Sequence, residues 1–273
     1  MRTRIFSKLT NREAEEYLSQ KSSIIVPVGT VEMHGDFPLD CETVVSEAIA
    51  LKMAEQIDSV ILNNLPYFYA GATLAGRGTV QVSIREGIDY LYAVAKSLLR
   101  QGFSRQIYIS FHGPAHMTLS PMVRDFFDET KTPILYLDLI MAVFKHAAEL
   151  IPDGNFYDIY VGAYDIMGRL EDVPLMPEKK EEEKKESSVK AFQDLFSRAY
   201  QSAAVGYYFG EKSDHAQTPV IRTAEERQLM ADRGREIIDR LVEKLDVPSV
   251  MSQLDDLDAF QNNSVFAKYG EWL

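Results

Sequence analysis

A short apolar run that ends abruptly in a polar loop is the feature that most constrains the fold of this chain. Residues 24–28 (Ile-Ile-Val-Pro-Val) have the length and β-branched content of a strand buried on both faces. Gly29, Gly35 and Pro38 then interrupt regular structure. The loop carries five carboxylate or imidazole side chains: Glu32, His34, Asp36, Asp40 and Glu42. Because open α/β sheets bind ligands just past the carboxyl ends of such strands, the pattern predicts a site here.

The spacing of Glu32 and His34 favours a metal as the ligand. Two residues apart on an extended segment, both side chains point to the same face, where they could meet one ion or a pair of ions. The alternative is an ordinary polar surface loop after a core strand. Short motifs of this kind often occur by chance in such loops.

A second apolar strand ends in a comparable loop. Residues 106–110 predict a buried strand, and Phe111-His112-Gly113-Pro114-Ala115-His116 follows it. The chain has five histidines, and three of them fall in these two loops. We therefore expect His112 to have a functional role, with a hydrogen-bonded structural histidine as the alternative.

Strands and helices alternate along the chain. Strands are predicted at 24–28, 60–62, 106–110 and 133–139, and helices at 11–20, 43–57, 87–101, 121–130, 140–150, 189–204 and from 223 to about 245. This alternation predicts one α/β domain, residues 1–273, around a mainly parallel sheet. Residues 177–188 form a charged excursion. Residues 247–273 read as a peripheral segment able to pack on a neighbouring subunit.

Composition excludes several classes of function. The net charge of −12 argues against nucleic acid or an anionic membrane as partner. The single cysteine, Cys41, fits a reducing compartment. The N-terminus has no apolar stretch of signal-peptide length, and the longest nearly apolar run, residues 134–144, is too short to span a membrane. We expect a soluble cytoplasmic protein. No G-x-G-x-x-G follows a strand, which disfavours a dinucleotide-dependent oxidoreductase.

The first loop also resembles a known family motif. Gly-Thr-Val-Glu-Met-His-Gly (29–35), followed by Phe-Pro-Leu (37–39) and Cys-Glu-Thr (41–43), is similar to the first signature of the creatininase (creatinine amidohydrolase) family, P-x-G-S-x-E-x-H-G-x-H-L-P-x-x-T-D. The resemblance, over residues 20–240, implies a three-layer α/β/α fold. It further implies that Glu32 and His34 bind a two-metal centre in which Glu42, or else Asp40, bridges the ions.

Two further segments resemble family features. The loop around His112 is similar to N-G-H-G-G-N or N-G-H-x-E-N, which implies that His112 is a metal ligand. Residues 110–111 are Ser-Phe instead of Asn-Gly, and Pro114 stands where some members carry a carboxylate, with His116 as the nearest substitute. Residues 66–80 end in Gly-Thr-Val, similar to F-P-G-T-V, so Tyr69 either packs or contacts substrate. Residues 206–219 occupy the place of a G-x-x-G-D-P turn, where Asp214 and His215 either border the site or turn the chain.

The third family signature, H-A-G-E-x-E-T-S, has no match. Residues 160–168 stand in its place, with Asp165 as a weak site candidate, and His146 and Glu149 resemble the signature only superficially. The signature normally supplies a catalytic His and Glu, so its absence leaves the proton donor for the leaving nitrogen unassigned.

The resemblance implies a metal-dependent hydrolase of a non-peptide C–N bond, an amide or cyclic amide of a small molecule. Glu32, His34, Glu42 and His112 would hold one or two ions of Zn²⁺, Mn²⁺ or Fe²⁺. The catalytic residues are not assigned, and family members often form hexamers, so a homo-oligomer is expected. The alternative is a catalytically degenerate member that binds a ligand or serves in an assembly.

Overall fold

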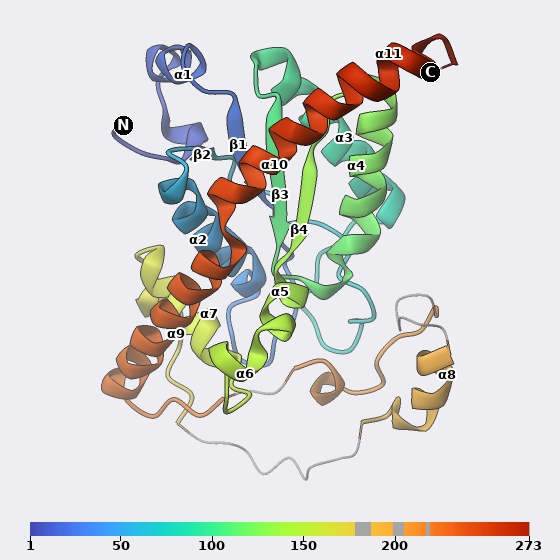
Figure 1. Ribbon diagram of the computed structural model, residues 1–273. Coiled ribbons are helices and arrows are strands. Elements are labelled where there is room, and N and C mark those ends of the chain that lie inside the picture. The colour runs from blue at the N-terminus through green and yellow to red at the C-terminus, as the bar shows by residue number, and fades with distance from the viewer. Residues whose placement is uncertain (178–186, 199–204, 217–218, 273) are drawn as a thin grey trace.

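A four-stranded parallel sheet forms the centre of the protein (Figure 1). The computed structural model describes residues 1–177, 187–198, 205–216 and 219–272. The strands, in the order β2-β1-β3-β4, are β1 (Ser23–Pro27), β2 (Val60–Ile61), β3 (Arg105–Ser110) and β4 (Leu135–Asp138). Because β1 pairs with β3 along its whole length, the loops that follow these two strands leave the sheet side by side.

The helices occupy most of the remaining described chain. They are α1 (Asn11–Leu18), α2 (Cys41–Gln56), α3 (Ile84–Gln101), α4 (His116–Thr130), α5 (Leu139–Lys145), α6 (Ala147–Leu150), α7 (Tyr157–Ile166), α8 (Gln193–Arg198), α9 (Ala224–Leu245), α10 (Val247–Phe260) and α11 (Ala267–Tyr269).

Alternate strand residues face opposite layers of helices. Ile25 and Ile107 pack in one core with α2, α7 and α9, whereas Ile24 and Tyr108 pack in a second core with α3 and α4. Figure 1 shows α2, α7 and α9 on one side of the sheet and α3 and α4 on the other. All four of these strand residues are at most 1% exposed, as expected for a sheet covered on both faces. The predicted α/β/α fold around a parallel sheet is therefore confirmed.

Helices α7 and α9 meet through two glycines. A Cβ atom at Gly162 would overlap the backbone of Gly234, and one at Gly234 would overlap the carbonyl of Asp158. The two helices therefore approach at backbone distance. Arg233 of α9 reinforces the contact with a bidentate ion pair to the buried Asp158, at 2.6 and 2.9 Å.

Several predicted element boundaries were wrong. The helix predicted to begin at residue 43 begins at Cys41, after Asp40, so Glu42 belongs to the first helical turn of α2 and not to the loop. Helix α4 begins at His116, five residues before the predicted start at Pro121, which lies inside the helix. The predicted helix 189–204 is a 3₁₀ turn followed by α8; its residues 199–204, and residues 178–186 of the charged excursion, lie outside the described chain.

Ion pairs join the C-terminal helix α10 to the amino end of β3. Arg105, at the start of β3, pairs with Asp255 and Asp258 of α10 at 2.5 and 2.8 Å, and Val247 and Leu254 are buried.

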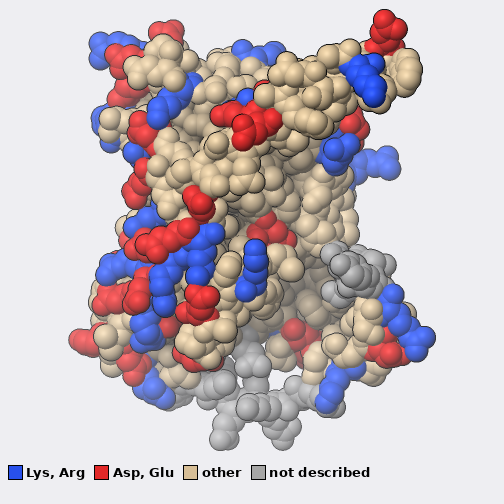
Figure 2. Space-filling model, in the orientation of Figure 1, with Lys and Arg blue, Asp and Glu red and all other residues tan. Residues whose placement is uncertain are grey.

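Acidic and basic side chains are interspersed over α9 in Figure 2, so the net charge of −12 does not form a single patch on that face. No helix of the described chain is long and apolar enough to cross a membrane.

Candidate metal centre

The loop after β1 is folded back on itself and buries Glu32 completely. The amide of Glu32 donates to the carbonyl of Leu39 at 2.8 Å, and the amide of Val80 donates to the carbonyl of Val31 at 2.9 Å. A Cβ atom at Gly29 would overlap Thr43, so a glycine is needed where this loop contacts α2. These contacts place the side chain of Glu32, which is 0% exposed, beside the first turn of α2.

Glu42 joins the histidines of the two strand-end loops. Its Oε1 atom lies 3.3 Å from His34 Nε2, and its Oε2 atom lies 2.5 Å from His112 Nδ1. The hydroxyl of Thr30 also donates to Oε2, at 2.7 Å. The predicted proximity of His34 and His112 is thus observed, with a carboxylate between them.

Glu32 lies on the other side of the same cluster. Its Oε2 atom is 3.6 Å from His112 Nδ1 and its Oε1 atom is 3.4 Å from His215 Nε2. Among the described residues, neither oxygen of Glu32 has a hydrogen-bond partner. Because buried carboxylates are normally hydrogen-bonded or bound to a cation, these two orphaned oxygens fit a metal ion.

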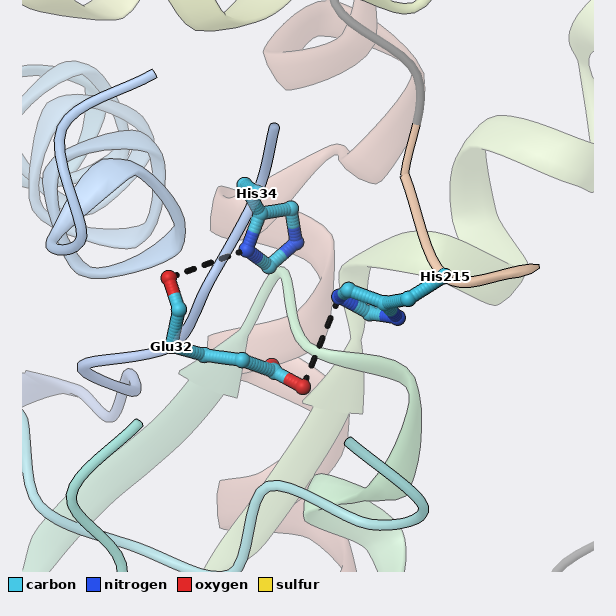
Figure 3. Close-up of side chains that lie close together, drawn as sticks. All are labelled: Glu32, His34 and His215. Atoms are coloured by element: carbon cyan, nitrogen blue, oxygen red, sulfur yellow. Dashed lines mark hydrogen bonds and ion pairs between the residues drawn. The ribbon is translucent and has the colours of Figure 1, made fainter. Parts of the chain in front are cut away.

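Two overlapping groups of ligand atoms result. Glu32, Glu42 and His112 form one, and Glu32, His34 and His215 form the other; within each group the ligand atoms lie within 4.8 Å of one another. Figure 3 shows His34 and His215 next to each other, with His34 near the backbone carbonyl of Glu32 and His215 facing its carboxylate. Glu32 belongs to both groups. The arrangement can hold one ion or two neighbouring ions that share a carboxylate.

Backbone carbonyls fix the orientation of two imidazoles. His112 Nε2 lies 3.0 Å from the carbonyl of Tyr69, and His34 Nδ1 lies 3.4 Å from the carbonyl of Glu32. A carbonyl can only accept, so each of these nitrogens carries a proton. The opposite nitrogens face the carboxylates, as in metal sites where a carbonyl sets the tautomer of a histidine ligand.

The two carboxylates of the cluster have pKa values shifted in opposite directions. Burial raises the pKa of Glu32 to about 7. Burial acts in the same direction on Glu42, but His112 and His34 outweigh it and hold the pKa of Glu42 well below its usual value. Burial, together with the nearby His34, lowers the pKa of His215 to about 4, which leaves this imidazole neutral. The protein therefore stabilises the ionised form of Glu42 and destabilises the ionised form of Glu32.

The remaining candidate residues lie in separate interactions. Asp40 accepts hydrogen bonds from Tyr164 at 2.5 Å and Arg169 at 2.7 Å, and belongs to neither ligand group, whereas Glu42 does. Asp165 pairs with Arg235.

Two candidates serve the local backbone. His116 Nδ1 donates to the carbonyl of Gly113 at 2.9 Å. Asp214 accepts the amides of Ser188 and Glu211, both at 2.9 Å, so it organises a turn. Of the six secondary candidates, only Tyr69 and His215 border the cavity beside the cluster.

That cavity has a volume of about 440 Å³. Its walls are mainly apolar and aromatic, and Glu42, His112 and His215 lie at its polar end. The lining residues are Glu42, Tyr69, Ala70, Gly71, Ala72, Thr73, His112, Gly113, Pro114, Met117, Ile140, Phe144, Val205, Tyr207, Phe209 and His215.

Sequence reasoning did not identify Tyr160, which stands where the third family signature would be. Its ring lies 6.1 Å from that of His34 and 5.7 Å from that of Phe111. Burial, with the nearby Glu42, raises the pKa of Tyr160 well above its usual value and keeps the phenol protonated. Its helical neighbours predict core packing, so no local signal distinguishes it.

The fold and the cluster together define a class: a three-layer α/β protein with a carboxylate–imidazole centre at the ends of parallel strands. Residues 7–246 match the family model of creatininase, creatinine amidohydrolase. The chain belongs to the creatininase family.

Solved structures agree with this fold. A creatininase in its Mn form superposes with a TM-score of 0.57 at 16% identity, over 89% of this chain and 98% of that one. A Bacteroides fragilis protein classed with the creatinine amidohydrolases gives 0.60 at 16% identity, over 90% and 94%. At such low identity these likenesses show the fold alone.

One characterised relative is similar over part of the chain. It is the 3-dehydro-scyllo-inosose hydrolase of Thermotoga maritima, 31% identical over 117 residues. The match spans 40% of this chain and 35% of the relative's length.

Proposed function

We propose that this protein is a metal-dependent hydrolase that cleaves a non-peptide C–N bond in an amide or cyclic amide of a small molecule. The observation that carries the proposal is the pair of ligand groups joined at Glu32, whose two buried oxygens lack hydrogen-bond partners in the described chain. Membership of the creatininase family supports hydrolysis as the class of reaction.

The metal set is Glu32, His34, Glu42 and His112, holding one or two divalent ions. Mixed nitrogen and oxygen ligands suit Zn²⁺, Mn²⁺ or Fe²⁺. Creatininases solved in a Mn form and, for a mutant, a Zn-Zn form support the first two. When bound, such an ion lowers the pKa of a coordinated water and polarises a substrate carbonyl.

The protein's own residues orient and shield this centre. The Tyr69 carbonyl and the Thr30 hydroxyl hold His112 and Glu42 in place, at 3.0 and 2.7 Å. Burial of Glu32 and His112 excludes bulk water, which strengthens the interaction of their ligand atoms with a cation.

The cavity indicates what the substrate looks like. Apart from the cluster residues Glu42, His112 and His215, its described lining carries no charged or imidazole side chain, and Tyr69, Phe144 and Phe209 provide aromatic surface. A neutral molecule with one apolar face fits this lining, its carbonyl toward the cluster and its ring toward the aromatic walls.

A second candidate is a catalytically degenerate family member that binds a small molecule. The replacement of the third signature by residues 160–168, with Tyr160 beside His34, favours it, because no histidine there can deliver a proton. We further infer that the protein is cytoplasmic and forms a homo-oligomer, a hexamer by family resemblance. Light scattering of the purified protein tests the oligomeric state.

Metal content and hydrolysis test the two candidates. We expect protein purified without chelator to hold one or two divalent ions, and Glu32→Ala and His112→Ala to lose them. The activity screen should contain lactams and cyclic imides, and also cyclic ketones, since the Thermotoga maritima relative is a hydrolase of an inosose. Hydrolysis of the ketones alone would overturn the C–N bond of the proposal while leaving the hydrolase. Metal bound without hydrolysis of any of these favours the degenerate member. Unchanged occupancy in both variants would overturn the ligand assignment.

A further inference from the structure

We propose that His215 is a metal ligand, and that its bond to the metal docks the segment 205–216 against the strand-end loops. This inference rests on the proposed metal-dependent function. It adds a ligand from a part of the chain about one hundred residues beyond His112.

The imidazole of His215 is aimed at the cluster and has nothing to bond there. Its Nε2 atom is buried, has no hydrogen-bond partner among the described residues, and lies 3.4 Å from Glu32 Oε1. Its ring centroid is 4.5 Å from that of His34, at an interplanar angle of 75° (Figure 3). A buried imidazole nitrogen facing an orphaned carboxylate oxygen is explained if both bind the same cation.

The residue at position 114 cannot bind a metal, so a ligand from elsewhere in the chain can take its place. Pro114, two residues after His112, offers no donor atom, and its ring packs toward the Gly71 loop, where an added Cβ would meet Pro114 Cγ at 2.8 Å. Pro114 and His215 both line the cavity. An imidazole from the opposite wall thus supplies a ligand atom that the loop after β3 lacks.

Within the described chain, few hydrogen bonds join the segment that carries His215 to the rest of the protein. The amide of Phe209 donates to the carbonyl of Ala72 at 3.0 Å, and Gly210 contacts the Ser188 hydroxyl at 3.1 Å. The ring of Tyr207 stacks on that of Phe196 of α8, with the centroids 4.7 Å apart, and Tyr207 belongs to neither buried core. A metal bond at His215 would therefore be a principal clamp on this segment.

This clamp also shapes the cavity. Tyr207 and Phe209 form part of its wall, and the ring of Phe209 lies 5.8 Å from that of His215. Metal binding at His215 would hold these aromatic rings against the loop at 69–73, so the occupied centre and the substrate wall form together.

Metal stoichiometry and the visible spectrum of the Co²⁺-substituted protein test the ligand. We expect wild type to bind two Co²⁺ ions and His215→Ala to bind one tightly and the second at least about tenfold more weakly, with a changed spectrum. His116→Ala is the matched control, since His116 bonds to the Gly113 carbonyl instead of facing the cluster. It should match wild type. His215→Glu should restore the second ion with a shifted spectrum, which a merely structural role would not produce.

Hydrogen exchange tests the docking. Adding Zn²⁺ to the metal-free wild type should slow amide exchange across residues 205–216, and should not do so in His215→Ala. Two ions and an unchanged Co²⁺ spectrum in His215→Ala would overturn this inference while leaving the metal-dependent function intact. A wild type that binds no metal at all would overturn both.

Discussion

The two walls of the candidate centre are built in different ways. On the sheet side, Glu32, Glu42 and His112 are between 0 and 5% exposed. The Thr30 hydroxyl holds Glu42, and the Tyr69 carbonyl holds His112. On the opposite side, His215 comes from the segment 205–216, most of whose residues are exposed or half-buried. The comparison indicates that the sheet preorganises one half of the centre, whereas the other half lies on a more exposed segment, whose position is proposed to depend on the bound metal.

The largest expected effect is on the sheet side, at Glu42. Glu42→Ala removes the acceptor shared by Thr30, His34 and His112, and also a proposed ligand of the metal. Unpairing these buried groups should lower the free energy of unfolding of the metal-free protein by about 1–3 kcal/mol. The metal-loaded state should lose about 2.7 kcal/mol more at a metal concentration of 100 times Kd. Urea unfolding with and without chelator measures both losses, and a variant as stable as wild type under both conditions would contradict the assignment.

Glu32 is expected to behave in the opposite way when no metal is present. Its folded pKa, about 7, is raised by burial above the ordinary value, so its charge destabilises the fold. That penalty is absent below the unfolded pKa and is fully present once the pH rises above the folded pKa. Glu32→Gln should therefore stabilise the metal-free protein by about 1–3 kcal/mol at pH 8, and by much less at pH 4.5.

Unfolding in urea at both pH values, in chelator, measures this gain. The same variant should lose metal binding, so a gain in stability would accompany the loss of the centre. A variant that is destabilised at pH 8 would show that the two carboxylates do not differ as the contacts indicate.

The sequence could predict the sheet side of this comparison because its signals are local. The apolar run at 24–28 and the loop residues Glu32 and His34 lie close together in the chain, and parallel pairing of β1 with β3 brings His112 beside them. The boundary of α2 was missed because both Asp40 and Thr43 are residue types that cap helices. Glu42 therefore seemed to lie in the loop, although its contacts with His34 and His112 depend on the helical turn.

The other side could not be predicted to the same degree. No periodicity or spacing links His215 to Glu32, which lie 3.4 Å apart although far apart in the sequence. Only long-range packing brings them together. Asp214, the adjacent candidate, turns the chain, and the choice between these two neighbours depends on side-chain direction, which the pattern of residues does not encode.

A pair of glycines tests how rigid the sheet side is. Gly29→Ala would place a Cβ atom against Thr43 at the start of α2, whereas Gly113→Ala would add a Cβ with no described atom within 4 Å. The first should cost about 1–3 kcal/mol through overpacking and weaken metal binding by displacing Glu42. The second should be close to neutral. Thermal unfolding and metal titration of both variants measure the difference, and equal effects would show that the loop after β1 yields as easily as the surface turn after His112.

The smallest effect is expected on the opposite wall, at Tyr207. This residue lines the cavity and stacks on Phe196, outside both buried cores. Tyr207→Ala should therefore change the free energy of unfolding by no more than about 0.5 kcal/mol, as surface substitutions usually do. It should leave the metal content unchanged while raising KM for any substrate that the activity screen identifies, because an aromatic wall is lost and no ligand atom is. A loss of stability as large as that of Gly29→Ala would mean that the segment 205–216 is as much a part of the folded scaffold as the strand ends, and the contrast between the two walls would be wrong.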